Sequence, residues 1–289
     1  MAAQRGRPWT RVLSLTVLIL AFVATVSAST GDKLPEFKNC LKVCKSENCA
    51  PNKPQTPIPV LHHLLLWTCA SECDYACQHI ITNKRMTSGL PVEQFYGKWP
   101  FYRFLGMQEP FSVLFSLGNL WAHWDGWKKV RAQIPKSYSM LPFYEWLAGI
   151  GVASWVFSSI FHTRDFRVTE ELDYFGAGAS VLYGLYYTTV RVFRLDKRTP
   201  RRRTVLRCWT LVCVFLYICH VCYLKFIDWD YTYNMAANVA VGIGQHGLWT
   251  WFSIDSLWHL MTIGPTILWY NFLVKDAQDD ISNNQRLKA

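Results

Sequence analysis

The segment Met140–His162 reads MLPFYEWLAGIGVASWVFSSIFH, an almost uninterrupted apolar run that is long enough to cross a bilayer as a helix. Ser158 and His162 stand at its end, and Asp173 opens the next apolar run eleven residues after His162. Ionisable side chains at membrane depth are costly in free energy. These residues therefore indicate a functional site where two membrane-spanning helices meet.

The composition of the whole chain predicts a polytopic membrane protein. The 289 residues are 51% hydrophobic and 16% aromatic and include 14 Trp. Several apolar runs reach about 20 residues, the length of helix that spans the hydrocarbon core. The net charge of +10 would also suit a nucleic-acid partner. The cations, however, lie mainly in short loops between apolar runs, where they set membrane orientation, so we expect membrane lipid and no nucleic acid around this chain.

Residues 1–28 have the pattern of a secretory signal peptide. Arg5, Arg7 and Arg11 precede the apolar run Val12–Val26, and the triplet Val26-Ser27-Ala28 provides a cleavage site. We expect cleavage after Ala28. The alternative is an uncleaved signal anchor, because the apolar run is only slightly too short to span. Both interpretations send the chain into the secretory pathway.

Six of the ten cysteines lie in residues 29–110, which we expect to form a small lumenal Cys-rich segment. An even number of cysteines in an oxidising compartment predicts three disulfides, but the sequence does not choose among the fifteen possible pairings. A zinc module is the alternative, and it is disfavoured because the spacings are not paired Cys-x2-Cys. The six residues are Cys40, Cys44, Cys49, Cys69, Cys73 and Cys77.

Residues 111–274 are expected to form an all-α transmembrane helical bundle, followed by a polar and disordered tail over residues 275–289. Basic clusters in 128–136 and 194–203 mark these two loops as cytosolic, which leaves the loop 162–171 in the lumen. The predicted spans are Phe111–Trp127, Met140–Phe161, Leu172–Phe193, Val205–Ile227, Tyr233–Phe252 and Ile254–Val274.

This topology brings polar residues of separate helices together at the lumenal side. Ser158 and His162 are four residues apart and share one face of a helix, and Asp173 begins the antiparallel neighbour. Asp255 and His259 repeat the four-residue spacing in the last apolar run. Serine, imidazole and carboxylate groups suit a metal ion that polarises a carbonyl and activates water. The pattern predicts an intramembrane hydrolase, whereas each residue taken alone is more often an interhelical hydrogen-bonding group.

Several ordered motifs cover nearly all of the chain after the signal. They are Gly97-Lys98-Trp99-Pro100-Phe101, Phe161-His162-Thr163-Arg164-Asp165, Leu172-Asp173-Tyr174-Phe175, Tyr231-Thr232-Tyr233-Asn234 and Leu257-Trp258-His259. Together with the six cysteines they resemble the Per1-like family of GPI-anchor lipid remodelling factors. That family is similar in turn to seven-span hydrolases of the alkaline ceramidase type.

The resemblance implies a phospholipase A2-type ester hydrolysis that removes the sn-2 acyl chain from the lipid of GPI-anchored proteins. It implies a multi-pass protein of the endoplasmic reticulum membrane, with the Golgi membrane as the alternative. By similarity, His162 and His259 would bind zinc. Asp173 would act as base or orient the metal-bound water, and Ser158 would assist the developing oxyanion.

The chain departs from the family pattern near residues 254–255. The position of the first histidine of the family's late His-x3-His pair is Asp255 here, which would exchange an imidazole ligand for a carboxylate. The stretch from Tyr233 to Val274 also has room for only two spans, so the chain has about six spans where the family has seven. We interpret this as an internal deletion and expect impaired catalysis. Simple alternation would then start the last helix on the cytosolic side, opposite His162.

Three alternative interpretations stay open. In the first, Ser158 is a nucleophile and His162 is its base, so that the reaction is the same and only its mechanism differs. In the second, the chain is a non-enzymatic chaperone or cargo adaptor for GPI-anchored proteins, and the intramembrane polar groups only join helices. In the third, it is a receptor of the same superfamily that binds a ligand without turning it over.

Overall fold

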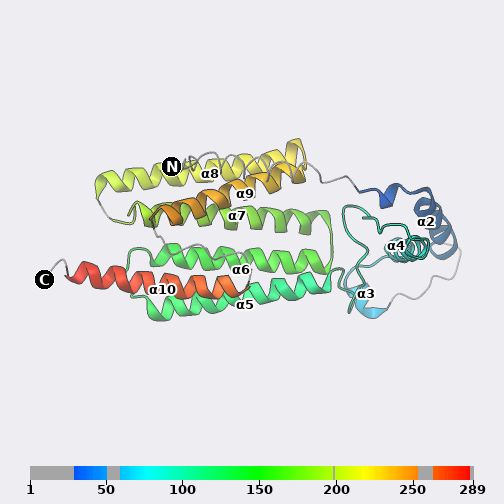
Figure 1. The fold of residues 1–289 in the computed structure, drawn as a ribbon, viewed down its shortest axis with the longest axis horizontal. Helices are drawn as coiled ribbons and strands as arrows, with labels where there is room; N and C mark the ends of the chain where they lie inside the picture. The colour runs from blue at the N-terminus through cyan, green and yellow to red at the C-terminus, as the bar shows by residue number, and fades with distance from the viewer. Residues whose placement is uncertain (1–28, 51–58, 198, 253–262, 287–289) are drawn as a thin grey trace, which may run out of the picture. The chain divides into compact units, whose positions relative to one another are not determined.

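The computed structural model describes residues 29–50, 59–197, 199–252 and 263–286. These residues form helices and no strand, which confirms the all-α prediction. The chain divides after Pro110 into two compact units, and each is considered by itself (Figure 1). Asp255 and His259, two of the predicted metal ligands, lie outside the described residues.

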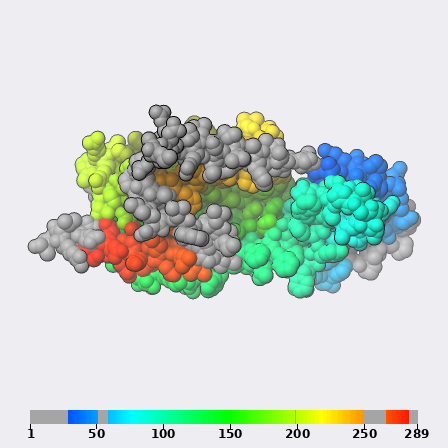
Figure 2. Space-filling model, in the orientation of Figure 1, coloured from blue at the N-terminus to red at the C-terminus, as the bar shows by residue number. Residues whose placement is uncertain are grey.

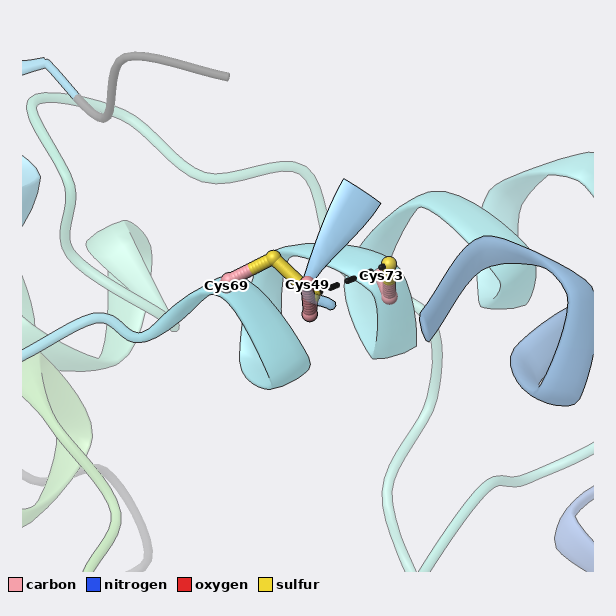
Figure 3. A group of neighbouring side chains, drawn as sticks. All are labelled: Cys49, Cys69 and Cys73. Carbon is pink, nitrogen blue, oxygen red and sulfur yellow. Dashed lines mark hydrogen bonds between the residues drawn. A yellow bond between two sulfur atoms is a disulfide. The ribbon is translucent and has the colours of Figure 1, made fainter. Parts of the chain in front are cut away.

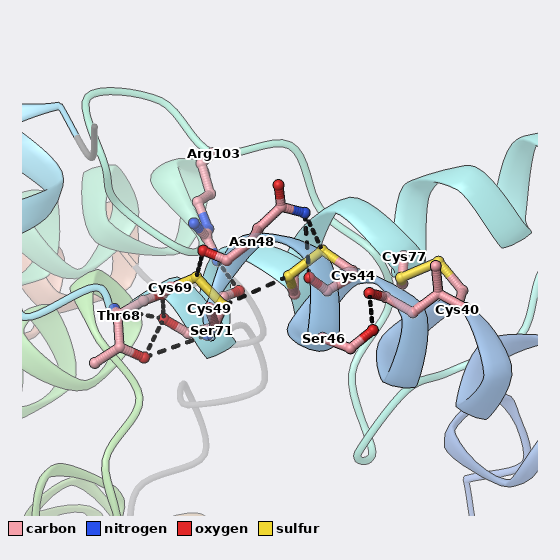
Figure 4. Close-up of a disulfide and its surroundings, with 12 residues drawn as sticks. Cys40, Cys44, Ser46, Asn48, Cys49, Thr68, Cys69, Ser71, Cys77 and Arg103 are labelled. Carbon is pink, nitrogen blue, oxygen red and sulfur yellow. Dashed lines mark hydrogen bonds between the residues drawn. A yellow bond between two sulfur atoms is a disulfide. The ribbon is translucent and has the colours of Figure 1, made fainter. Parts of the chain in front are cut away.

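The amino-terminal unit is built on two antiparallel helices, α2 (Pro35–Asn48) and α4 (Cys69–Thr87), with the short helices η1 (Gly31–Lys33) and α3 (Val60–Leu64) beside them in the chain. Three disulfides join α2 and its C-cap to α4 (Figure 4). Cysteines four residues apart lie on one helix face, so the cysteine face of α2 packs against that of α4. The predicted number of disulfides is confirmed, and the pairs are Cys40–Cys77, Cys44–Cys73 and Cys49–Cys69.

The segment after α4 is held against that helix by Arg103. Its guanidinium carbon lies 3.2 Å from the ring centroid of Trp67 and 4.0 Å from that of Tyr75, and Nη1 pairs with Glu72 at 2.9 Å. Cation–π contacts of this kind stabilise a partly desolvated arginine. Trp67 in turn donates its indole N–H to the carbonyl of Gly106 at 2.8 Å. These contacts fix the aromatic segment between α4 and residue 110.

The second unit is a bundle of six long helices within the described part of the chain. They are α5 (Pro110–Gln133), α6 (Leu141–Thr163), α7 (Arg167–Val192), α8 (Pro200–Cys222), α9 (Tyr231–Phe252) and α10 (Ile263–Arg286), and α8 continues into the π-helical turn η2 (Tyr223–Ile227). Each helix overlaps one predicted span. In the described residues, only Pro200–Ile227 is long and apolar enough to qualify as a span by length and composition. The polytopic topology therefore stays a prediction.

The buried core of the bundle lies toward the carboxyl end of α7. Tyr144 of α6, Tyr187 of α7 and Tyr270 of α10 are almost completely buried there, together with Val130 of α5 and Leu273 of α10. Figure 2 shows α10, coloured orange to red, along the surface of this unit, so only one face of that helix enters the core. The core fixes α5, α6, α7 and α10 against one another.

Helices α9 and α10 both run parallel to α7. The Tyr231 hydroxyl donates to Glu170 near the start of both α9 and α7, and Gln245 lies against Gly184 fourteen residues further along each helix. Arg191 pairs with Asp276 and Arg194 pairs with Asp280, so the sequence advances in the same direction along α7 and α10. Figure 1 shows α9 and α10 pointing the same way. The expectation that the last helix begins where α9 ends is therefore wrong.

The polar segment after residue 274 is helical rather than disordered, because α10 continues to Arg286. Asp276 and Asp280 are one turn apart and receive paired hydrogen bonds from Arg191 and Arg194. Bidentate arginine–carboxylate pairs are strong and directional. The expectation of a disordered tail is wrong for residues 275–286, since the arginines that order it lie at the end of α7 and just after it, far away in the sequence.

Candidate functional site

A cavity of about 530 Å³ lies among α5, α6, α7, α9 and α10. Ser158 of α6 and Asp173 of α7 both line it, so the structure brings together two of the residues that the sequence singled out. The connection between α6 and α7 is only three residues long, Arg164 to Phe166, and it forces the two helices to lie side by side as antiparallel neighbours. The cavity is therefore the candidate site.

Ser158 is buried, with 7% of its surface exposed. The hydroxyl of Ser116 on α5 donates a hydrogen bond to Ser158 Oγ at 3.2 Å. A buried hydroxyl needs such a partner, and because Ser116 supplies the donor, the proton of Ser158 remains available to another acceptor. Ser116 is a site residue that sequence reasoning missed, because a serine in an apolar run carries no signal of its own.

Asp173 lies two turns into α7 and is partly buried. The start of this helix is fixed locally, because the Phe166 amide donates to Thr169 Oγ1 at 2.9 Å and the same hydroxyl donates to the Arg164 carbonyl at 3.0 Å. Capping of this kind satisfies amides that have no partner inside the helix. The position of Asp173 along α7 is thus determined by the turn that precedes it.

His162 is on the same helix as Ser158 but is not among the residues that line the cavity. It lies in the last turn of α6, with its ring centroid 5.1 Å from that of Phe161. The four-residue spacing predicted one shared face for Ser158 and His162. The structure places both at the same end of α6, and only Ser158 reaches the cavity wall.

His123 of α5, with Gln245 and His246 of α9, also lines the cavity, and the sequence reasoning missed all three. His123 Nδ1 lies 2.9 Å from the hydroxyl of Tyr270 on α10. A histidine inside the apolar run Phe111–Trp127 was a usable signal by the rule that flagged His162. It was overlooked because it belongs to no spaced pair of ligands.

The described part of the chain contains one group of three possible metal donors within 4.8 Å of one another, the sulfur atoms of Cys49, Cys69 and Cys73 (Figure 3). Each of these sulfur atoms is already in a disulfide. Zinc binds thiolates, so this group is a structural crosslink. The histidines and carboxylates of the described residues form no such group.

The sequence profile of the Per1-like family matches residues 59–256 of this chain. The chain is 35% identical to "Protein PER1 homolog" of Schizosaccharomyces pombe, over 93% of this chain and 94% of the relative. It is 36% identical to "Protein PER1" of Saccharomyces cerevisiae, over 81% and 71%. It is 31% identical to "GPI-specific phospholipase A2-like PGAP3" of Bos taurus, over 90% and 93%. No solved structure matches.

The alignments show that these relatives contain residues that this chain lacks. The alignment with the Schizosaccharomyces pombe relative spans 314 positions and that with the Bos taurus relative spans 302, whereas this chain has 289 residues in total. Similarity nevertheless extends over most of both partners, from the cysteine-rich unit through the bundle. The chain belongs to the Per1-like family.

Proposed function

We propose that this chain remodels the lipid of GPI anchors by hydrolysing the sn-2 ester of the GPI phosphatidylinositol. The name of the Bos taurus relative describes that protein as GPI-specific and phospholipase A2-like. The observation that carries the proposal is the meeting of the Ser158 hydroxyl and the Asp173 carboxylate in one cavity of the bundle. GPI-anchored proteins would be the substrates, and membrane lipid would surround the bundle.

The two side chains have complementary roles in ester hydrolysis. Asp173 would take a proton from the attacking water, as a general base. Ser158 would donate its hydroxyl proton as a hydrogen bond to the carbonyl oxygen as that oxygen gains negative charge. Ser116 holds Ser158 by donating to its oxygen, which leaves the Ser158 proton free for this purpose.

Zinc is the proposed ion, by family resemblance, with His162, His259 and Asp255 as its ligands. A bound zinc ion would polarise the ester carbonyl and lower the pKa of water. Of these ligands only His162 is among the described residues. Among the described residues, no group of three or more imidazole and carboxylate donors lies within ligating reach, so the steps assigned above use only Ser158, Asp173 and Ser116.

The proposed setting is the endoplasmic reticulum membrane, crossed several times, with the Golgi membrane as the alternative. Asp173 lies in the amino-terminal part of α7, and the basic loop 194–203 follows the other end of that helix. The positive-inside rule assigns that loop to the cytosol. The site would then face the lumenal leaflet, where the anchor lipid of a lumenal protein lies.

We further propose that this chain hydrolyses its substrate more slowly than its longer relatives. Helices α9 and α10 run the same way, so a return crossing must separate them in a membrane. Only ten residues, 253–262, connect them, and a helix needs about 20 to cross the hydrocarbon core. The missing residues would include the histidine whose place is taken by Asp255.

The test is release of a labelled sn-2 acyl chain from a synthetic GPI lipid in proteoliposomes that contain the full 289-residue chain. We expect a slower rate than that of the Schizosaccharomyces pombe relative, and a gain when the relative's residues are inserted between Phe252 and Ile263. S158A and D173N should abolish release. S159A is the matched control, because Ser159 donates to the Trp155 carbonyl at 2.8 Å on the same helix.

Two results would contradict the proposal in different ways. Release at the relative's rate, with zinc bound, would refute the impairment and leave the hydrolase assignment intact. No release from the chain, even with the insertion, would refute the hydrolase assignment. If cells that express the H162A variant still delivered GPI-anchored proteins to their surface normally, we would replace the hydrolase assignment with the adaptor alternative.

A further inference from the structure

The cavity that contains Ser158 and Asp173 is elongated along the helices. On α6 it extends from Ser158 to Leu147, which corresponds to about 16 Å at the rise of an α-helix. On α7 it extends from Asp173 to Tyr187, about 21 Å by the same rise. One acyl layer of a bilayer is about 15 Å thick. The cavity therefore has the length of an acyl chain, with the proposed reacting groups at one end.

The wall between those ends is largely apolar, which suits a hydrocarbon chain. Leu147, Trp155, Ala177, Val181 and Trp269 line it. An acyl chain that enters from the bilayer exchanges one apolar surrounding for another, so an apolar wall accepts it without the cost of desolvating polar groups. Polar side chains also line the cavity, namely Ser154, Ser180, His246 and Thr266 besides His123 and Gln245. Of these, His123 and Gln245 are the two whose side chains lie closest to a glycine of a neighbouring helix.

Each of the two polar side chains lies directly opposite a glycine. A Cβ at Gly151 of α6 would lie 2.2 Å from His123 Nδ1, and one at Gly184 of α7 would lie 2.3 Å from Gln245 Oε1. Real Cβ atoms do not approach this closely, so any side chain at either position must displace its neighbour. Glycine at these sites is therefore what lets His123 and Gln245 occupy their positions.

His123 has little freedom to move elsewhere. Its ring is tied to the Tyr270 hydroxyl at 2.9 Å, and the Tyr270 ring itself fits only because residue 126 is glycine, where a Cβ would lie 2.1 Å from the ring. A methyl group at residue 151 would therefore displace the imidazole, which lines the cavity. The corresponding change at residue 184 would push the Gln245 amide.

We propose that the cavity holds the acyl chain of the lipid ester, and that the pairs Gly151–His123 and Gly184–Gln245 set the longest chain that fits. This inference rests on the proposed function. Gly151 is seven residues from Ser158, a depth of about 10 Å, and Gly184 is eleven residues from Asp173, a depth of about 16 Å. The two pairs therefore act in series, the first nearer the ester and the second nearer the chain end.

The experiment measures lipid binding, so that it does not depend on turnover. Purified full-length chain is mixed with phosphatidylinositols that share one sn-1 chain and differ in the sn-2 chain. The sn-2 chains have roughly 8, 12, 16 or 20 carbons, so that the longest of them is longer than one acyl layer is thick. Bound lipid is quantified by native mass spectrometry. The variants are G151A and G184A, and the matched controls are G149A on α6 and G244A on α9, where a Cβ has nothing closer than 4.0 Å and 3.9 Å respectively.

We expect G184A to weaken binding of the longest chains about tenfold and to leave the shorter ones unchanged, since overpacking of this kind costs about 1.4 kcal/mol or more. G151A should extend the loss to the intermediate chains. Q245A, which removes the deeper polar side chain, should instead improve binding of the longest chain. This variant keeps the proposal testable if the alanine variants do not fold.

A uniform loss across the chain-length series, or the same losses in G149A and G244A, would overturn the inference. Unchanged binding in G151A, G184A and Q245A would overturn it as well. Length-dependent binding, combined with no hydrolysis even by the chain that carries the insertion, would support the inference and refute the hydrolase proposal. Hydrolysis, combined with variants that do not change how binding depends on sn-2 chain length, would support the hydrolase proposal and refute the inference.

Discussion

Arg191 donates two hydrogen bonds of 2.8 Å each to the carboxylate of Asp276, which joins the carboxyl end of α7 to α10 across 85 residues of sequence. Both side chains are mostly buried, with 14% and 20% of their surfaces exposed. Together with the Arg194–Asp280 pair one turn further along, this pair fixes the direction of α10. Since α9 also runs parallel to α7, two successive helices of the described part of the chain point the same way.

Loss of this ion pair should destabilise the bundle. R191A would leave the Asp276 carboxylate mostly buried without its partner, and we expect a loss of about 3 kcal/mol in the free energy of unfolding, measured by denaturant titration in detergent. R131A is the control, because Arg131 is 65% exposed where it pairs with Glu145, and exposed pairs contribute about 0–1 kcal/mol. Equal losses in the two variants would contradict the importance of the buried pair.

The direction of α10 predicts which side of the membrane holds the carboxyl terminus. R286T creates a glycosylation acceptor at Asn284, and we expect this asparagine to remain unmodified because the end of α10 lies beside the basic loop after α7. If the last helix instead alternated with α9, Asn284 would be lumenal and would carry a glycan. Glycosylation is read as a gel mobility shift that an endoglycosidase reverses.

Two further acceptors provide the controls for this topology. M86N creates an acceptor in the exposed end of α4, and we expect it to be glycosylated in the lumen. R202N creates one in the first turn of α8, within the basic cluster 194–203, and we expect it to remain unmodified. A glycan on the R202N variant, or no glycan on the M86N variant, would contradict the predicted orientation of the whole chain in the membrane.

The third disulfide should rearrange when its neighbour is removed. Cys73 Sγ lies 3.9 Å from Cys49 Sγ, and Cys73 is normally held by Cys44. In C44S the freed Cys73 thiolate can attack Cys49, which forms a Cys49–Cys73 disulfide and releases the Cys69 thiolate. Among the six cysteines of the amino-terminal unit, we expect peptide mapping to find Cys69 as the predominant free thiol; Cys208, Cys213, Cys219 and Cys222 are free in any case. C40S is the control, since it frees Cys77, and recovery of Cys73 as the free thiol in C44S would contradict the prediction.

Stability of the amino-terminal unit should fall as the pH drops below about 6.5, the ordinary pKa of histidine. Burial lowers the pKa of His79, whose ring lies 4.4 Å from both Tyr75 and Tyr102. The folded state therefore binds the proton less readily than the unfolded state. The stability contributed by neutral His79 is present above the unfolded pKa and is lost as the pH falls toward the folded pKa.

H79F tests this assignment, because phenylalanine keeps the ring contacts and cannot be protonated. We expect the variant to lose less thermal stability than the unmodified chain between about pH 7 and pH 5, a window around the ordinary histidine pKa. H63F, at an exposed position, should leave the pH dependence unchanged. An identical slope in H79F and the unmodified chain would exclude His79 as its cause.

The positions of the helices followed from the apolar runs, because a run of about 20 apolar residues has few other stable conformations. The predicted ends differ from the observed ones by a few residues for most helices, as for Met140–Phe161 against Leu141–Thr163. The last helix departs furthest. Its polar end is ordered by Arg191 and Arg194, and no local pattern announces partners that lie more than eighty residues away.

The candidate site was predictable only in part. Ser158 and Asp173 were found because their spacing and the short connection between α6 and α7 are local features. Ser116 and His123 were not found, because each acquires its role from a helix that is distant in sequence: Ser116 from Ser158, and His123 from Tyr270 and Gly151.

The sequence by itself determined that the chain is helical, that six cysteines pair off, and that serine, histidine and acid residues stand at the ends of apolar runs. These properties depend on residue type and on short spacings in the sequence, so they can be inferred from local stretches of the chain. Only the tertiary structure decided which cysteines pair, which polar residues share a cavity, and that α9 and α10 run parallel. Those outcomes depend on the register and direction of helices far apart in the chain, and they are set by packing and by ion pairs that form only when the helices come together.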